Sequence, residues 1–123
     1  MGLMQMTSGQ FKQEILRQYN EINKRVFDVG VRRHKVEIVG NKIVIVSLNS
    51  RIPILKLVDG FDPSATRQLD RALQQYIKSE IRRLFECTFQ MNVVAVLKDY
   101  DAETEHSGTI VILERDLAHY LND

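Results

Sequence analysis

One long stretch, residues 63–88, has the hydrophobic periodicity of a single amphipathic helix, and it constrains the fold more than any other segment. Asp62 is suited to cap this helix, and Pro63 to occupy its first turn, where the missing N–H costs no hydrogen bond. The apolar side chains recur every three or four residues and form one face: Leu69, Leu73, Tyr76, Ile77, Ile81, Leu84 and Phe85. A helix with one apolar face has to pack against a second layer, so the rest of the chain must supply one.

Two β-rich runs separated by Gly40-Asn41 predict an antiparallel hairpin, because both residues accept the positive φ of a two-residue turn. The first run, residues 35–38, alternates charged and apolar side chains. The second, residues 42–48, is apolar on both faces. We therefore expect the second run to lie centrally in a sheet and to be covered on both sides, in one interpretation by a partner subunit.

Further elements complete the layers. A helix should begin at a capping box made by Thr7 and Gln10 and end near residues 28–30. Residues 93–97 and 109–113 read as two more strands, and the tail has a weak helical pattern.

Strand pairs that alternate with helices favour an α+β two-layer sandwich over a doubly wound fold. The expected order is α-β-β-α-β-β-(α), with a four-stranded, largely antiparallel sheet and the helices packed on one face. With 123 residues the chain suits one domain. We expect a flexible N-terminus over residues 1–9 and a single α+β domain over 10–123.

The segment between the hairpin and the long helix, residues 49–61, contains Pro53 and Gly60 and is interpreted as a connector. It is unusually apolar for a loop, so it should pack against something. Together with the second strand it predicts a homodimer interface or an apolar ligand pocket, the alternative being an ordinary core with a packed loop. The candidate interface residues are Ile52, Ile54, Leu55, Leu57, Val58 and Phe61.

The net charge of +1 conceals an asymmetric chain. Residues 1–97 hold 15 basic and 9 acidic side chains, a net of +6, and residues 98–123 hold two and seven, a net of −5. A basic face attracts anions or nucleic acid, and the alternative is a solvated face paired with the acidic segment of the same or a neighbouring chain. The candidate anion-binding residues are Arg32, Arg33, Lys35, Arg67, Arg71, Arg82 and Arg83.

The acidic loop at residues 99–106 has the oxygen-rich side chains that hard cations prefer. It does not fit the calcium-binding EF-hand pattern, and a solvated hairpin loop explains it as well. The candidate metal ligands are Asp99, Asp101, Glu103, Glu105 and His106.

Little in the sequence points to catalysis. Cys87 is the only cysteine, which excludes an intramolecular disulfide, and we expect it to be inert in the apolar company of Phe85 and Phe89. No serine stands in a Gly-x-Ser-x-Gly elbow, and no glycine-rich phosphate loop occurs. We predict no catalytic residue, no cofactor and no enzymatic activity.

The run from Lys35 to Val46, the arginine-rich helix, and the segments 94–101 and 108–115 together resemble the small bacterial MpsC-like family. The resemblance covers roughly residues 10–115. It implies association with a membrane system that couples sodium movement and membrane potential to inorganic-carbon uptake.

No run approaches the 18 apolar residues of a membrane span, and no signal peptide is recognisable, so we expect a cytoplasmic protein. The function favoured is a non-enzymatic accessory or binding protein. We expect it to be a homodimer, and peripheral to the membrane through a membrane-protein partner. The alternative is an anion or nucleic-acid binding module that uses the basic face, with nucleic acid the less favoured ligand.

Overall fold

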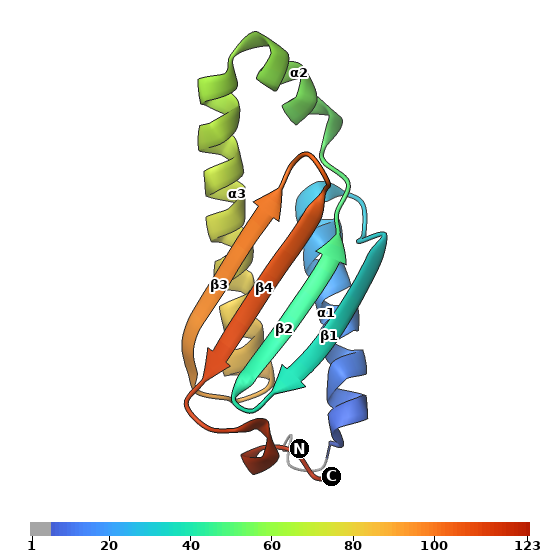
Figure 1. Ribbon diagram of the computed structural model, residues 1–123, viewed down its shortest axis with the longest axis vertical. Helices are drawn as coiled ribbons and strands as arrows, with labels where there is room; N and C mark the ends of the chain where they lie inside the picture. The colour runs from blue at the N-terminus through green and yellow to red at the C-terminus, as the bar shows by residue number, and fades with distance from the viewer. Residues whose placement is uncertain (1–5) are drawn as a thin grey trace.

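A computed structural model of the protein describes residues 6–123 and has two layers (Figure 1). The elements follow in the order α1 (Ser8–Phe27), β1 (Arg33–Val39), β2 (Lys42–Leu48), α2 (Pro53–Phe61), α3 (Pro63–Arg83), a π-helical turn (Leu84–Thr88), β3 (Val93–Asp101), β4 (His106–Leu113) and a 3₁₀ turn (Leu117–His119). The strands form one sheet in the order β1-β2-β4-β3, and every neighbouring pair is antiparallel. Helices α1 and α3 lie on one face of the sheet, which confirms the predicted α+β sandwich.

The hairpin between β1 and β2 is the predicted one. Gly40 has a φ of +61°, a conformation that a side chain would disfavour, and Val39 pairs with Lys42 across the two-residue turn. Strand β2 lies between β1 and β4, so its predicted central position is confirmed.

The first helix begins at the predicted capping box. Thr7 Oγ1 accepts a hydrogen bond from the Gln10 N–H at 3.2 Å, and Gln10 Oε1 accepts one from the Thr7 N–H at 3.0 Å. Each partner satisfies a donor that the first helical turn leaves open. Of the predicted flexible segment 1–9, residues 1–5 lie outside the described residues, and α1 begins at Ser8.

The connector prediction for residues 49–61 was wrong for most of its length, because Pro53–Phe61 is the helix α2. Pro53 occupies the first helical position, where proline is favoured, and Gly60 stands in the last turn, where it interrupts little. The apolar residues that made the loop seem unusual are spaced as on a helix, but nine residues are too few for the period to stand out.

Three phenylalanine rings anchor the helical layer to the sheet. Phe11 of α1 packs edge-to-face on Phe89 with ring centroids 4.9 Å apart, and Phe85 and Phe89 are 5.4 Å apart. The π-helical turn widens the end of α3 so that both rings enter the core, and Cys87 between them points outward and is exposed. The prediction that Cys87 lies in apolar surroundings was therefore wrong.

The opposite face of the sheet is not covered by any helix of residues 6–123, and we call it the open sheet face (Figure 1). The alternating positions that point to it are half-buried or exposed, in contrast to Ile43, Ile45 and Val111 on the helix side, which are at most 1% exposed. Its centre is apolar, formed by Val44, Val46, Ala95, Leu97, Ile110 and Ile112.

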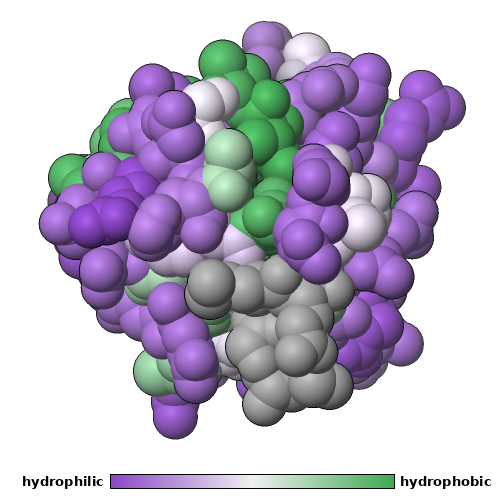
Figure 2. All heavy atoms as spheres, turned by 90° about the horizontal axis from the view of Figure 1, so that it is seen from below, coloured by the Kyte–Doolittle hydropathy of each residue, from purple (hydrophilic) through white to green (hydrophobic). Residues whose placement is uncertain are grey.

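Both ends of the described chain lie at the same end of the molecule, where the Asn122 N–H donates to the carbonyl of Met6 at 2.9 Å. Seen from that end, the surface is mostly hydrophilic, with a hydrophobic band bordered by hydrophilic side chains (Figure 2).

Candidate functional site

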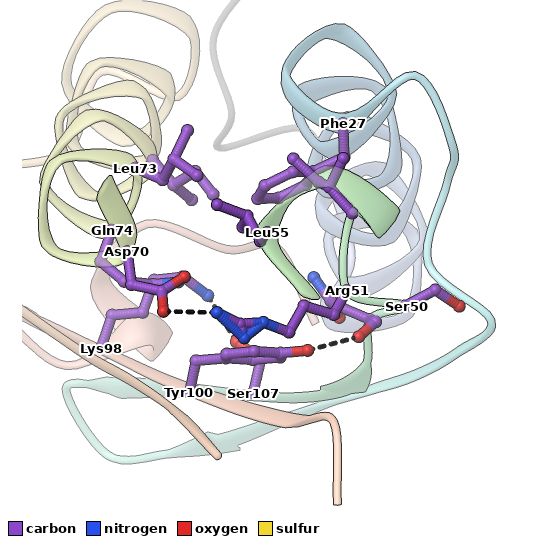
Figure 3. Close-up of a pocket in the computed structure, with 13 residues that line it drawn as sticks. Phe27, Ser50, Arg51, Leu55, Asp70, Leu73, Gln74, Lys98, Tyr100 and Ser107 are labelled. Carbon is purple, nitrogen blue, oxygen red and sulfur yellow. Dashed lines mark hydrogen bonds and ion pairs between the residues drawn. The ribbon is translucent and has the colours of Figure 1, made fainter. Parts of the chain in front are cut away.

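A small cavity lies on the helix side of the sheet, where α2 and α3 meet the linker that follows β2 (Figure 3). Apolar side chains of three helices, Phe27, Leu55 and Leu73, line one side of it, and polar side chains from the linker, α3, β3 and β4 line the other. The cavity has a volume of about 20 Å³, which is room for one water molecule. In this conformation the cavity is too small for an organic substrate.

The floor of the cavity is polar because the inward positions of β3 and β4 change character along the strands. Val96 and Val111 face each other in the core, and one step further along the sheet the inward pair is Lys98 and Thr109. The next pair is Tyr100 and Ser107.

The ammonium group of Lys98 is held by three hydroxyl groups. It donates to Ser107 Oγ at 2.5 Å, to the Tyr19 hydroxyl at 3.1 Å and to Thr109 Oγ1 at 3.4 Å. Within residues 6–123 it makes no salt bridge. The three N–H bonds of a lysine are thus used, while its positive charge has no carboxylate partner.

Tyr19 responds to that charge. Burial by itself raises the pKa of the phenol, but the charge of Lys98 and the hydrogen bonds of Ser47 and Lys98 outweigh it and lower the pKa to about 8. The polar chain continues from Ser47 Oγ to Asn49 Oδ1 at 2.6 Å, and from Asn49 Nδ2 to Asn23 Oδ1 at 2.7 Å. The arrangement ties α1 to the linker after β2 through buried hydrogen bonds.

An ion pair between a buried arginine and a half-buried aspartate closes the second side of the cavity. The Arg51 side chain is 8% exposed, and its Nη2 donates to Asp70 Oδ2 at 2.8 Å (Figure 3). The N–H of Arg51 donates to Glu105 Oε2 at 2.7 Å, and Arg32 contacts the other oxygen of Glu105 at 2.8 Å. These contacts, that of the Arg51 N–H first and the charge of Arg32 next, lower the pKa of Glu105.

Two residues that line the cavity each have a buried polar atom without a hydrogen-bond partner among residues 6–123, namely Arg51 Nε and Gln74 Oε1. One is a donor and the other an acceptor, so a single water in the cavity would suit both. The Ser107–Lys98 contact has the composition of a serine–lysine catalytic pair, but Ser107 is 1% exposed and no acyl substrate reaches it. The geometry is that of a hydrogen-bonded polar network that joins α1, the linker after β2, β3 and β4.

The predicted anion-binding residues occupy several separate places. Arg33 and Lys35 lie on the open sheet face of β1, while Arg32 contacts Glu105. Arg67 and Arg71 stand in the first half of α3 and Arg82 and Arg83 at its end, about 20 Å further along the helix. No single site includes all seven.

The predicted metal ligands are likewise spread out. Asp99 and Asp101 lie on the open sheet face at β3, and His106 lies on the same face at the start of β4. The Asp101 carboxylate accepts hydrogen bonds from the Glu103 N–H and the Thr104 hydroxyl, at 3.2 and 3.0 Å. In the part of the chain that the structure describes, no three His, Cys, Asp or Glu side chains come together as a metal site.

The predicted interface residues divide between two sides of α2. Leu55 is 4% exposed and packs into the cavity wall, while Ile52 and Val58 are half-buried. Ile54, Leu57 and Phe61 are 61%, 76% and 94% exposed. We call these three side chains the α2 ridge.

The sequence reasoning missed the members of the polar network: Tyr19, Arg51, Asp70, Gln74 and Lys98. One signal was present, because Lys98 stands two residues after the core residue Val96 in a strand that alternates. A lysine at an inward position predicts a buried polar partner.

This is an α+β domain with a buried polar network, and no helix of residues 6–123 is long and apolar enough to cross a membrane. Residues 7–115 match the family model described as Na+-translocating membrane potential-generating system (MpsC). The match covers nearly the whole chain, so the chain belongs to the MpsC family. The comparisons found no match among curated proteins or solved structures.

Proposed function

We propose that this chain is a non-enzymatic, cytoplasmic accessory component of the Na+-translocating system after which its family is described, and that it binds a protein partner in the membrane through the α2 ridge. The observation that carries the proposal is the exposure of Ile54, Leu57 and Phe61. Their spacing of three and four residues sets them on one side of α2, and an exposed apolar stripe of this kind is typical of a helix that binds in a groove.

The position of α2 supports this role. The helix lies beyond the end of the sheet, so a partner can approach it without meeting the rest of the molecule (Figure 1). Its other side is fixed to the domain by Leu55, which leaves the ridge displayed on an anchored element.

The charges near the ridge favour a protein over the lipid surface. Lys56 precedes Leu57, and Asp59 and Asp62 flank Phe61; all three charged side chains are exposed, which gives one positive and two negative charges beside the ridge. Carboxylates at that place are repelled by the anionic headgroups of a cytoplasmic leaflet. A groove in a protein that carries basic groups at its rim would accept them.

Membrane sedimentation tests the proposal with membranes from cells that encode this chain. We expect the unmodified chain to sediment with the membranes, and the triple variant I54S/L57S/F61S to lose most of that binding. Val29→Ser is the matched control, because Val29 is 51% exposed and lies outside α2. Its binding should be unchanged.

Two further experiments distinguish binding to a membrane protein from binding to lipid. Protease treatment of the membranes before mixing should abolish binding, and liposomes made from the extracted lipids should bind neither form. Equal binding of the triple variant, or retention by protein-free liposomes, would overturn the proposal. Circular dichroism of each variant checks that the fold is kept.

A further inference from the structure

The open sheet face carries opposite charges on its two outer strands. On β1 the exposed charged side chains that point to this face are Arg33, Lys35 and Glu37, and Glu37 forms a salt bridge with Lys35 at 3.0 Å; on β3 they are Asp99 and Asp101. Between them lies the apolar centre of β2 and β4, where Val46 is 47% exposed. An exposed apolar patch with charged borders is typical of an interaction surface.

The strand register places the opposite charges at the same position along the strand direction. Lys35 pairs with Val46, Val46 with Gly108, and Gly108 with Asp99, so the four residues form one row across the sheet. The next row reads Arg33, Leu48, His106 and Asp101. These two rows therefore begin with a base and end with an acid, while the row on the other side of Lys35 begins with Glu37 and ends with Leu97.

A two-fold axis that runs parallel to the strands reverses each row and keeps its height. A second copy placed face to face about this axis sets its β3 against β1 and its β4 against β2. Lys35 then faces the partner subunit's Asp99, and Arg33 faces the partner subunit's Asp101. Stacked sheets are rotated by about 30°, which shifts the outer strands by roughly one residue, and the long basic side chains span that shift.

Gly108 supplies a second observation. Its φ is not in the left-handed region, and a Cβ built on it meets nothing within 4 Å, so neither the backbone nor the neighbouring side chains require glycine there. Glycine weakens the interior of a strand unless something has to approach closely. About the two-fold axis, the partner subunit's Val46 lies over Gly108 and fills the space above it.

The other face-to-face arrangement is less favourable. A two-fold axis across the strands would set Asp99 and Asp101 against the partner subunit's Leu97 and the partner subunit's Ala95, and Lys35 against the partner subunit's Glu37. That arrangement has one kind of ion pair and leaves two carboxylates without a base, whereas the axis parallel to the strands has two kinds and leaves only Glu37 facing an apolar side chain. The face is about 20 Å on each side by strand spacing and rise, or roughly 800 Å² over two copies, which is less than stable interfaces bury and predicts a dimer that dissociates on dilution.

We infer that the chain forms a homodimer through the open sheet face, with the two-fold axis parallel to the strands, so that the basic edge of each copy pairs with the acidic edge of the other. This interface is separate from the α2 ridge and does not depend on the proposed function. It gives the asymmetry between the +6 and −5 parts of the chain a role in self-recognition.

Sedimentation velocity across a concentration series tests the inference. We expect the mass obtained for the unmodified chain to be twice 14.3 kDa, and to fall on dilution as the dimer dissociates. Lys35→Glu sets acid against acid, and Asp99→Lys sets base against base. Because each contact occurs twice in the dimer, each single variant should raise the dissociation constant by about tenfold or more. Arg67→Glu, an exposed charge on α3, is the control and should change nothing.

Variants with complementary charges test whether Lys35 faces the partner subunit's Asp99. A mixture of K35E and D99K chains should form heterodimers, since each copy then offers the other a complementary edge, and the K35E/D99K double variant should recover the homodimer. Gly108→Val should keep the monomer folded, as judged by circular dichroism, and weaken the dimer. A monomer at about 100 µM unmodified chain would overturn the inference. Failure of both compensation arms would overturn it too.

Discussion

At the scale of single residues, Lys98 is the least expected side chain of the molecule. Its side chain is half-buried on the helix side of β3, and its ammonium group lies against Ser107, Tyr19 and Thr109, all of them neutral hydroxyl groups. Hydroxyl dipoles replace part of the water that a buried charge loses, but they do not cancel the charge. The nearest group that can become negative is the phenol of Tyr19, and this explains why its pKa is lowered despite burial.

The first prediction concerns this pair. The near-ultraviolet absorbance of tyrosinate should show one phenol that titrates at a pH of about 8, and Tyr19→Phe should remove that step. Lys98→Met removes the charge and leaves the burial, so it should raise the pKa of Tyr19 above its usual value. If the step persists near its original pH in the Lys98→Met variant, the electrostatic explanation is wrong.

The same shift predicts how stability depends on pH. Between the folded pKa of about 8 and the unfolded value of 10.0, the unfolded chain keeps a proton that the folded chain has released, so stability rises with pH across that range. The contribution is present above the unfolded pKa and is lost as the pH falls through the folded one. It should reach about 1 kcal/mol near pH 9 in urea unfolding. The Tyr19→Phe variant should lack this rise.

At the scale of elements, the parts that the sequence predicted well are those fixed by neighbouring residues. The capping box at Thr7, the positive φ at Gly40 and the long period of α3 are all local, and each is present. Helix α2 was missed because its nine residues, bounded by Pro53 and containing Gly60, resemble a loop.

The cavity could not be predicted in the same way, because it is assembled from distant parts of the chain. Tyr19 and Lys98 are 79 residues apart, and Arg51 and Asp70 belong to different elements. Only the fold brings them together. An inward lysine on an alternating strand signals that a polar partner exists, but not which residue it is.

Helix α2 is anchored through a single buried side chain, and this gives the next prediction. Leu55→Ala should lower the free energy of local opening of α2 by about 2 kcal/mol, because it removes buried apolar atoms from the cavity wall. Amide hydrogen exchange over residues 53–61 should become roughly thirtyfold faster while the strands stay protected. Leu57→Ala removes an equal number of atoms from a side chain that is 76% exposed, and should change the exchange little.

At the scale of the whole molecule, the two proposed contacts use different surfaces. The α2 ridge lies beyond one end of the sheet, and the open sheet face lies opposite the helical layer (Figure 1). A dimer formed through the sheets would leave both ridges accessible, so each dimer would present two docking helices. Two linked contacts bind a membrane more tightly than one, because the second binding step takes place within the complex.

The charge asymmetry of the chain makes the dissociation constant of the dimer sensitive to salt, to an extent that a charge-reversal variant reduces. In the unmodified dimer, added salt screens the attraction between the basic and acidic edges, so the dissociation constant should rise with ionic strength. In the K35E homodimer one contact of each edge becomes repulsive while Arg33 still faces the partner subunit's Asp101, so the dissociation constant should rise much less with ionic strength. The two curves should converge at high salt, where the apolar contacts of Val46 and its neighbours remain. An interface made through the α2 ridge would give equal salt dependence for both chains, because Lys35 lies outside it.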